Sequence, residues 1–339
     1  MTGTTITRQE MQMPQTSQQY KEALAIEVQG LTKRYGPNTV VNNLHLAIPQ
    51  GSIFGFLGQN GAGKTTTIRM LLGLINATSG RASILGHDTV TGRHHILPKV
   101  GAIVETPTFY PYLSGRENLK QLALVAGAPF SRIDEVLEQV ELSERAKDKV
   151  KTYSLGMKQR LGIAAALLNN PRVIFLDEPT NGLDPQGTVD MRNLILRLGQ
   201  SGHTIFVSSH LLHEVEQMCS HVAIINRGKL VVQGSIEELL EGTTKTLLEV
   251  TPIPTAVQIL TQILGQEARV REMDARTIEL EIDPETVPDA VQALVGAGVR
   301  IYSVAQQKAS LENYFLAVTG VGKDLEDNQQ TVAAPNLAA

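Results

Sequence analysis

The feature that most limits the possible folds is a glycine-rich turn between a predicted strand and a predicted helix. The apolar segment S-I-F-G-F-L (52–57) runs into G-Q-N-G-A-G-K-T-T, which places Gly58, Gly63, Lys64 and Thr65 in the pattern G-x-x-x-x-G-K-[ST]. Glycines let successive backbone amides point at phosphate oxygens, and the following helix adds the positive end of its dipole. A chance glycine-rich turn is the alternative, but the flanking strand and helix argue against it. The pattern therefore predicts a phosphate-binding loop in an α/β protein.

The residues of this turn predict a site for a nucleoside triphosphate with magnesium. Lys64 can reach the β- and γ-phosphates, and the Thr65 hydroxyl can bind Mg²⁺. The predicted nucleotide-binding residues of the turn are Gly58, Asn60, Gly61, Ala62, Gly63, Lys64, Thr65 and Thr66.

A second predicted strand, V-I-F-L-D-E, ends in two adjacent carboxylates, Asp177 and Glu178. Residues at the carboxyl end of a strand face the crevice where α/β proteins bind ligands. We predict that Asp177 holds the magnesium, directly or through its waters, and that Glu178 polarises the attacking water as a general base. Two acids after an apolar strand are also found as a helix cap or in a solvated loop, and their pairing with the phosphate loop favours the catalytic interpretation.

The length and the order of predicted elements indicate two domains between two polar ends. The chain has 339 residues, more than the roughly 100 to 200 of a typical domain. Over residues 25–242, short β-branched runs alternate with helical stretches, which is typical of a largely parallel α/β sheet. Over residues 243–320, the order β-α-β-β-α-β with one further helix predicts a small α+β domain of the ferredoxin-like kind. We predict disorder for the polar arm 1–24 and for the tail 321–339.

Five motifs in a fixed order make the chain resemble the ATP-binding subunit of an ABC transporter, over residues 26 to about 235. Besides the phosphate loop and the paired acids, which match the Walker A and Walker B motifs, they are Y-S-L-G-M (153–157), P-T-N-G-L-D-P (179–185) and S-S-H (208–210). The resemblance implies a P-loop NTPase fold with a helical subdomain at about residues 106–168. It also implies that the chain binds ATP with Mg²⁺ and hydrolyses it.

The same resemblance assigns roles to single residues. Tyr35 falls where the family stacks an aromatic ring on adenine, and Asp184 matches the aspartate of the D-loop. His210 matches the switch histidine that bonds the γ-phosphate, although a polar residue at a helix start is an alternative interpretation. Glu178, His210 and Lys64 are the predicted catalytic set.

The segment Y-S-L-G-M resembles the family signature L-S-G-G-Q, with Tyr153, Leu155 and Met157 in place of its leucine, first glycine and glutamine. Ser154 suits the N-cap of a predicted helix, because its oxygen can accept from an amide of the first turn. Gly156 lies in that turn, where glycine costs roughly 1 kcal/mol relative to alanine. In the family, this turn covers the nucleotide held by a second subunit in a head-to-tail dimer. Ser154 would then offer a hydroxyl and Gly156 an unobstructed amide to that nucleotide, with Leu155 and Met157 packed beneath the turn. Because the sequence shows one phosphate loop and one signature, we expect a working unit of two such chains, a homodimer, with one other subunit of the same kind as the alternative.

Glu105 stands where the family has a glutamine after its third motif strand. This glutamate, and the segment P-T-F-Y-P-Y-L-S-G-R-E-N-L from Pro107 to Leu119, resemble the exporter ATPases tied to bacitracin-type and lantibiotic-type peptide resistance. A carboxylate can still ligate magnesium, so the predicted metal-binding set is Thr65, Asp177 and Glu105. An exposed loop acid is the alternative interpretation of Glu105.

The resemblance implies two partners, a second ATP-binding subunit and a separately encoded transmembrane permease. The sequence has no apolar run near the roughly 18 to 20 residues that span a membrane, so we expect the chain at the cytoplasmic face of the cell membrane, held there by the permease. Phe109, Tyr110 and Tyr112 could line its docking groove or pack locally under a loop. The net charge of −4 argues against nucleic acid as a partner.

These observations favour the motor subunit of an exporter over three alternatives. A soluble ABC ATPase acting on DNA would carry a long coiled coil, and one acting on ribosomes would carry two cassettes. An importer ATPase with a regulatory tail fits Glu105 less well. A nucleotide-binding regulator without turnover would lack Glu178 or His210. For the C-terminal domain, we expect a dimer-stabilising role rather than regulation by a ligand.

Overall fold

The computed structural model describes residues 23–240, 245–264, 269–307 and 310–319. The predicted N-terminal arm up to residue 22 and the predicted tail 321–339 lie outside these residues. Within the described residues, no helix is long and apolar enough to cross a membrane.

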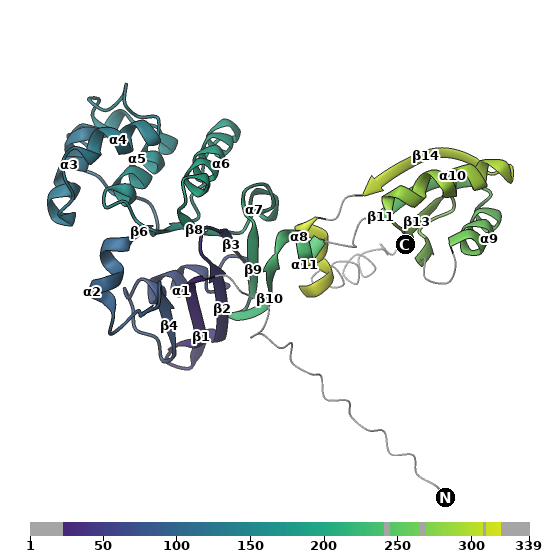
Figure 1. Ribbon diagram of the computed structural model, residues 1–339, viewed down its shortest axis with the longest axis horizontal. Coiled ribbons are helices and arrows are strands. Elements are labelled where there is room, and N and C mark those ends of the chain that lie inside the picture. The colour runs from purple at the N-terminus through teal and green to yellow at the C-terminus, as the bar shows by residue number, and fades with distance from the viewer. Residues whose placement is uncertain (1–22, 241–244, 265–268, 308–309, 320–339) are drawn as a thin grey trace, which may run out of the picture.

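A six-stranded sheet forms the centre of the N-terminal part of the chain (Figure 1). Its strands, in spatial order, are β10 (Lys229–Ser235), β9 (His221–Asn226), β3 (Ile53–Leu57), β8 (Thr204–Ser209), β7 (Val173–Asp177) and β6 (Val100–Ile103). From β9 to β6 the neighbours pair in parallel, and β10 pairs antiparallel to β9. Every residue of β7 and β8 is buried, as expected for parallel strands that are covered on both faces.

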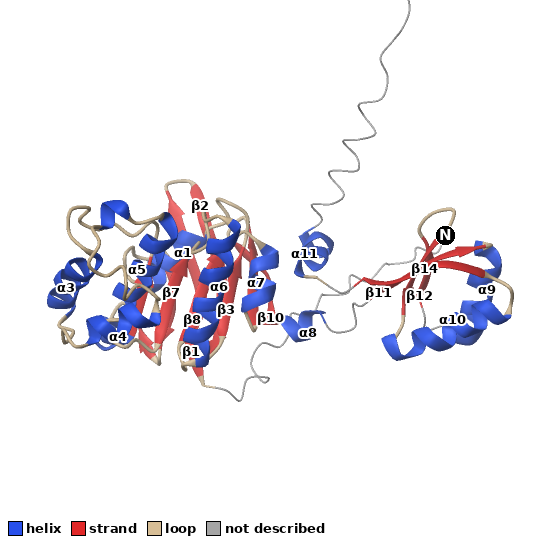
Figure 2. Ribbon diagram, turned by 90° about the horizontal axis from the view of Figure 1, so that it is seen from above, coloured by secondary structure: helices blue, strands red, loops and turns tan. Residues whose placement is uncertain are grey.

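Helices cover both faces of this sheet, and Figure 2 shows α6 and α7 lying across one of them. Up to residue 240, the described helices outside the helical subdomain are α1 (Lys64–Leu71), α2 (Arg93–Ile96), the 3₁₀ turn η1 (Leu97–Lys99), α6 (Pro185–Gln200), α7 (Leu212–Met218) and α8 (Ile236–Leu240).

Alternate residues of the strands pack into two different cores. Phe54, Phe56, Phe175 and Phe206 are fully buried on one face, and their side chains pack with α1. The Phe206 ring lies 5.3 to 5.8 Å from the other three rings. The aliphatic residues between them face the opposite side and pack with α5, α6 and α7. The period of two along a strand therefore assigns each residue to a layer.

The first strands form a separate antiparallel sheet, which differs from the largely parallel sheet that the sequence pattern predicts for residues 25–242. This sheet has the order β2-β1-β4-β5, with β1 (Leu24–Tyr35), β2 (Asn38–Pro49), β4 (Ser79–Ile84) and β5 (His87–Asp88). Only Gly36 and Pro37 connect β1 to β2, and so short a connection can join only antiparallel strands. Its buried face packs over the phenylalanine core.

A helical subdomain is inserted between β6 and β7, within the predicted range 106–168. It contains α3 (Gly115–Ala126), α4 (Arg132–Gln139), the 3₁₀ turn η2 (Val150–Thr152) and α5 (Leu155–Leu167). Helix α3 begins with a capping box, in which Ser114 and Glu117 satisfy each other's backbone amides, and ends at Gly127 in the left-handed conformation. The three helices contact one another, and α5 contacts β6.

Residues 245–307 form a third sheet with its own core. Along the chain its elements are β11 (Lys245–Thr251), α9 (Ile253–Leu264), β12 (Arg269–Glu272), β13 (Thr277–Glu281), the 3₁₀ turn η3 (Pro284–Thr286), α10 (Val287–Gly296) and β14 (Arg300–Gln307). The antiparallel strand order β12-β13-β11-β14 and the β-α-β-β-α-β sequence of elements agree with the predicted pattern. Assignment of this unit to the ferredoxin-like class stays a prediction.

The last described helix, α11 (Leu311–Thr319), lies within the range 243–320 that was predicted as the C-terminal domain, but it packs on the N-terminal part of the chain. It contacts α7 and α8 of the N-terminal part, and Leu311 and Phe315 belong to the same hydrophobic core as Val215 and Met218 of α7. The Leu311 amide also donates to the Glu216 carboxylate at 3.0 Å. The apolar face of α11 is therefore buried on the N-terminal core, which the order of elements along the sequence does not reveal.

Candidate functional site

Four strands of the central sheet bring their carboxyl ends to one edge, where the predicted site residues follow them. The phosphate loop follows β3, Asp177 ends β7, His210 follows β8, and Glu105 lies two residues beyond β6. Because β6, β7, β8 and β3 are parallel neighbours, these residues come together although they are far apart in the sequence.

The predicted strand, turn and helix around the phosphate loop are confirmed. Gly63 has φ of +106° and precedes the first residue of α1, Lys64. At Gly58, an added Cβ would lie 2.7 Å from the Ile225 carbonyl oxygen, so only glycine fits there. The Lys64 side chain is 6% exposed, and its Nζ donates to the Gly58 carbonyl at 2.7 Å and to the Gln59 carbonyl at 3.4 Å. The loop thus folds around the lysine ammonium.

The other predicted residues of the loop surround this lysine. Asn60 and Gly61 are exposed, Ala62 is buried, and Thr65 and Thr66 are half-buried in the first turn of α1. The tip of the loop is therefore open to solvent, and the two threonines after the lysine are partly covered.

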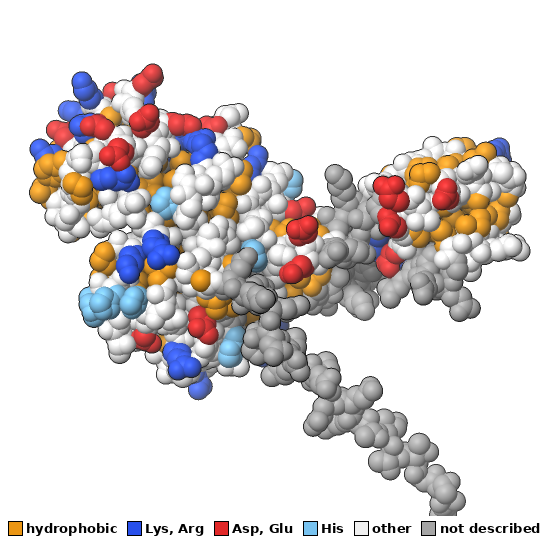
Figure 3. Space-filling model, in the orientation of Figure 1, with side chains coloured by type: hydrophobic (Ala, Val, Ile, Leu, Met, Phe, Trp, Pro, Cys, Tyr) orange, Lys and Arg blue, Asp and Glu red, His pale blue; other side chains and the backbone are white. Residues whose placement is uncertain are grey.

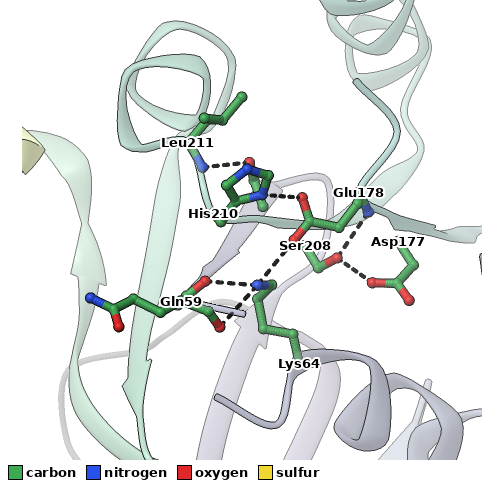
Figure 4. A network of polar contacts seen from close by, with 9 residues as sticks. Gln59, Lys64, Asp177, Glu178, Ser208, His210 and Leu211 are labelled. Atoms are coloured by element: carbon green, nitrogen blue, oxygen red, sulfur yellow. Dashed lines mark hydrogen bonds and ion pairs between the residues drawn. The ribbon is translucent and has the colours of Figure 1, made fainter. Parts of the chain in front are cut away.

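The three predicted catalytic side chains form one network (Figure 4). Glu178 Oε1 lies 3.0 Å from Lys64 Nζ, and Glu178 Oε2 lies 2.8 Å from His210 Nδ1. Glu178 is the first residue after β7 and has a φ of +50°, a conformation that is uncommon for a non-glycine residue. The carboxylate therefore stands between the lysine of the phosphate loop and the histidine after β8.

Ser208 holds both acids, and the sequence analysis missed it. Its fully buried hydroxyl donates to Asp177 Oδ1 at 2.5 Å and accepts from the Glu178 amide at 3.0 Å (Figure 4). The Glu178 amide also donates to the Ser208 carbonyl at 3.2 Å. The segment S-S-H carries a signal for this role, since a serine in an otherwise apolar buried strand needs a polar partner.

The residues at this edge fit Mg²⁺ bound partly by phosphates and waters better than a metal ion that is coordinated only by protein side chains. Among the described residues, no group of three or more His, Cys, Asp or Glu side chains is placed to hold a metal ion. Magnesium is usually bound by one or two carboxylates together with substrate phosphates and waters. Asp177, which is 7% exposed and oriented by Ser208, and the Thr65 hydroxyl provide such a partial set.

Glu105 forms an ion pair that the sequence analysis did not anticipate. Its carboxylate pairs with the guanidinium of Arg69, a residue of α1. Glu105 also has a φ of +67°. Its predicted role as a magnesium ligand stays a prediction. Its side chain is 64% exposed in the loop after β6, so the alternative interpretation as an exposed loop acid also stays open, with Arg69 as the partner of this acid.

Tyr35 ends β1 with its ring half exposed, and Lys33 Nζ lies 4.9 Å from the ring centroid. An exposed aromatic face can stack on a base. The adenine-binding role of Tyr35 stays a prediction.

The signature segment begins α5 and presents Ser154 and Leu155 to solvent. Ser154 is the predicted N-cap, and its Oγ accepts from the Met157 amide at 3.2 Å. A Cβ added at Gly156 would come no closer than 3.8 Å to another atom, so the packing of this chain does not require a glycine there. Leu155 is 39% exposed, contrary to the expectation that it packs beneath the turn, whereas Met157 packs against the core.

Two further positions of these motifs have structural partners. Tyr153, which replaces the family leucine, is buried, and its hydroxyl donates to the Arg145 carbonyl at 2.7 Å. Asp184 caps α6, because its carboxylate accepts from the Gly187 amide at 3.0 Å.

Comparisons with known proteins agree with these motifs. The model of the ABC transporter family matches residues 41–181. The chain is 40% identical over 296 residues to the uncharacterized ABC transporter ATP-binding protein YdbJ of Bacillus subtilis, covering 87% of this chain and 95% of that protein. It is 42% identical over 301 residues to the bacitracin transport ATP-binding protein BcrA of Bacillus licheniformis, covering 88% of this chain and 98% of that protein. A solved ATP-binding subunit of an ABC transporter superposes with a TM-score of 0.57 at 28% identity, covering 64% of this chain and 92% of that one.

Proposed function

Because this chain belongs to the ABC transporter family of ATP-binding proteins, an ATPase family, we propose that it is the ATP-hydrolysing motor subunit of an exporter. The observation that carries the proposal is the network of Lys64, Glu178 and His210 at the edge of the parallel sheet. A lysine beside a phosphate loop, a carboxylate and a histidine are the groups that bind a terminal phosphate and activate water.

Each side chain of the network has a distinct task. The Lys64 ammonium binds the phosphates and neutralises their charge, and the loop amides orient them. Glu178 accepts the proton of the attacking water, and His210, which contacts its second oxygen, holds the carboxylate in place. Asp177 and Thr65 would hold Mg²⁺, which when bound supplies charge neutralisation at the phosphates. Lys64 Nζ and Glu178 Oε1 form an ion pair at 3.0 Å, so a bound phosphate replaces the carboxylate as the partner of the ammonium.

The signature turn supports a site that two chains complete together. Gly156 has room for a side chain within its own chain, and Ser154 and Leu155 beside it are exposed. A helix N-terminus with a free hydroxyl and an unobstructed amide is suited to an anion. We propose that this turn covers the nucleotide of a second copy, with Met157 anchoring it and Asp184 following in the facing loop.

Closure of such a dimer can drive transport only if a partner protein changes its conformation together with the dimer. ABC ATP-binding subunits work with a transmembrane permease, and we propose that a separately encoded permease holds this chain at the cytoplasmic face of the membrane. Tyr110 and Tyr112 are 67% and 74% exposed beside the helical subdomain, and they support a docking surface there. The name of the bacitracin transport relative supports a role in transport, and the resemblance of Glu105 and the segment after it to exporter ATPases favours export over import.

A soluble ATPase acting on nucleic acid is the second candidate, and the surface favours it less. On the face shown in Figure 3, acidic and basic side chains are mixed over the helical subdomain. A nucleic-acid-binding protein typically gathers lysine and arginine on one face.

The hydrolytic role is tested by Glu178→Gln, which keeps the shape of the side chain and removes the base. We expect the turnover number to fall by about 10²- to 10⁴-fold, with ATP binding retained and an ATP-dependent dimer accumulating in size-exclusion chromatography. Glu135→Gln is the control, since Glu135 is an exposed acid that pairs with Arg132, and it should hydrolyse ATP normally. Normal turnover in the Glu178 variant would refute its role as base.

The transport role needs a separate experiment. We expect the chain to appear in the membrane fraction when it is expressed with a permease encoded beside it, and in the soluble fraction when it is expressed alone. Equal distribution in both cases would contradict a permease-bound motor.

A further inference from the structure

The ion pair between Arg69 and Glu105 joins two segments that border the site. Arg69 lies in α1, five residues after Lys64 of the phosphate loop. Glu105 lies in the segment that leads from β6 to the helical subdomain. The pair is therefore a direct polar link between the phosphate-binding helix and the connection to the helical subdomain.

The sheet register places Glu105 beside the catalytic edge. Strands β6 and β7 are parallel, with Ile103 paired to Leu176. Glu105 and Glu178 each lie two residues beyond this pair. Both have positive φ, at +67° and +50°. The chain thus carries two acids in rare backbone conformations at adjacent strand ends, and each is paired with a basic residue of α1.

The pair has an electrostatic consequence for a triphosphate ligand. The side chains of Arg69 and Glu105 are 38% and 64% exposed, so their attraction adds little to folding stability. A glutamate at this place carries a charge that the family's glutamine lacks, and that charge repels a polyanion at distances within the screening length, about 10 Å at 0.1 M salt. A guanidinium on the carboxylate cancels this repulsion and fixes the carboxylate in place.

We propose that Arg69 is the positioning residue of Glu105, and that it lets this chain use a glutamate at the rim of the ATP site by neutralising and orienting its carboxylate. This inference rests on the proposed ATP-binding function. It predicts that Arg69 is required only while position 105 carries a negative charge.

A double-mutant cycle tests the proposal with full-length protein. The variants are Arg69→Gln, Glu105→Gln and the two combined, and the measurement is the Kd of a fluorescent ATP analogue with Mg²⁺ at low salt. Arg69→Gln should weaken binding about 3- to 10-fold, as expected for one unpaired charge near the phosphates. In the Glu105→Gln background, the further substitution Arg69→Gln should change the Kd by less than about twofold, because no unpaired carboxylate remains.

Two further measurements distinguish an effect of the Arg69 charge from an effect of its packing. The loss in Arg69→Gln should shrink at 1 M salt, where the screening length is about 3 Å, and Arg69→Lys should restore most of the affinity because it keeps the positive charge. Arg116→Gln is the matched control, since Arg116 forms an ion pair of similar exposure with Asp134 in the helical subdomain. It should leave the Kd unchanged.

The outcomes are distinct from those that test the proposed function. If the unmodified chain does not bind the ATP analogue, the proposed function itself fails. If it binds, and Arg69→Gln binds as well as the unmodified chain or is not rescued by the second substitution, the positioning role of Arg69 is overturned. A loss that is the same at low and high salt would likewise show that Arg69 acts through packing instead of charge.

Discussion

Ser208→Ala removes the one hydroxyl that joins the two acids of the site. Its bond to Asp177 involves a charged acceptor, and such bonds contribute about 1.5 to 3 kcal/mol, whereas the neutral bond from the Glu178 amide contributes about 0.5 to 1.5 kcal/mol. Asp177 is only 7% exposed, so water cannot easily replace the lost donor. We expect a loss of about 2 to 4 kcal/mol in the free energy of unfolding, or roughly 5 to 15 °C in Tm.

The adjacent serine provides the control for this substitution. Ser209 is 1% exposed, and its hydroxyl accepts from the Leu211 amide at 3.0 Å. Leu211 is 42% exposed, so water can reach this neighbourhood and Ser209→Ala should cost less than half as much. Differential scanning calorimetry of both variants measures the difference.

The same substitution should change how ATPase activity depends on magnesium. Without the Ser208 hydroxyl the Asp177 carboxylate is free to rotate, so we expect half-maximal activity at a several-fold higher Mg²⁺ concentration, with Ser209→Ala unchanged. Equal stability losses in the two variants, together with an unchanged magnesium dependence, would refute the role assigned to Ser208.

Two other predictions concern the signature turn and the single cysteine. Gly156→Asp should fold normally, because a Cβ there meets nothing closer than 3.8 Å. It should nevertheless reduce ATP turnover about 100-fold, because it places a carboxylate against the phosphates bound by the other subunit. Circular dichroism measures the folding and phosphate release measures the turnover, and unimpaired hydrolysis would contradict the shared site. Cys219 is half-buried against the core, and burial of its thiol raises the pKa above the ordinary value, so the thiol should react with a thiol reagent at least about tenfold more slowly in the folded protein than in urea. Equal rates in the two states would contradict this burial.

The local features of the site could be predicted from the sequence because they depend on nearby residues alone. The glycines of the phosphate loop, the Ser154 cap and the strand that ends in Asp177 follow from backbone sterics, caps and apolar patterns, and the structure confirms each. The family and the α/β fold followed from the order of these motifs, which the comparisons confirm.

Other parts of the fold could not be predicted, since they depend on which elements become neighbours. The β1 and β2 hairpin and the packing of α11 on α7 and α8 were missed because the alternation of strands and helices does not specify the sheet that a strand joins. Leu155 is exposed for a similar reason, because the orientation of a helix start depends on its neighbours in space.

The sequence by itself determined the chemistry of this protein: a phosphate loop, two acids and a histidine, each at the end of a strand. Only the tertiary structure decided their partners, such as the hydroxyl of Ser208 on Asp177 and the guanidinium of Arg69 on Glu105. The reason is physical. A local pattern fixes the backbone of its own segment, whereas a bond between residues 31 or 36 positions apart depends on strand order, register and side-chain rotamers that are set when the whole sheet packs.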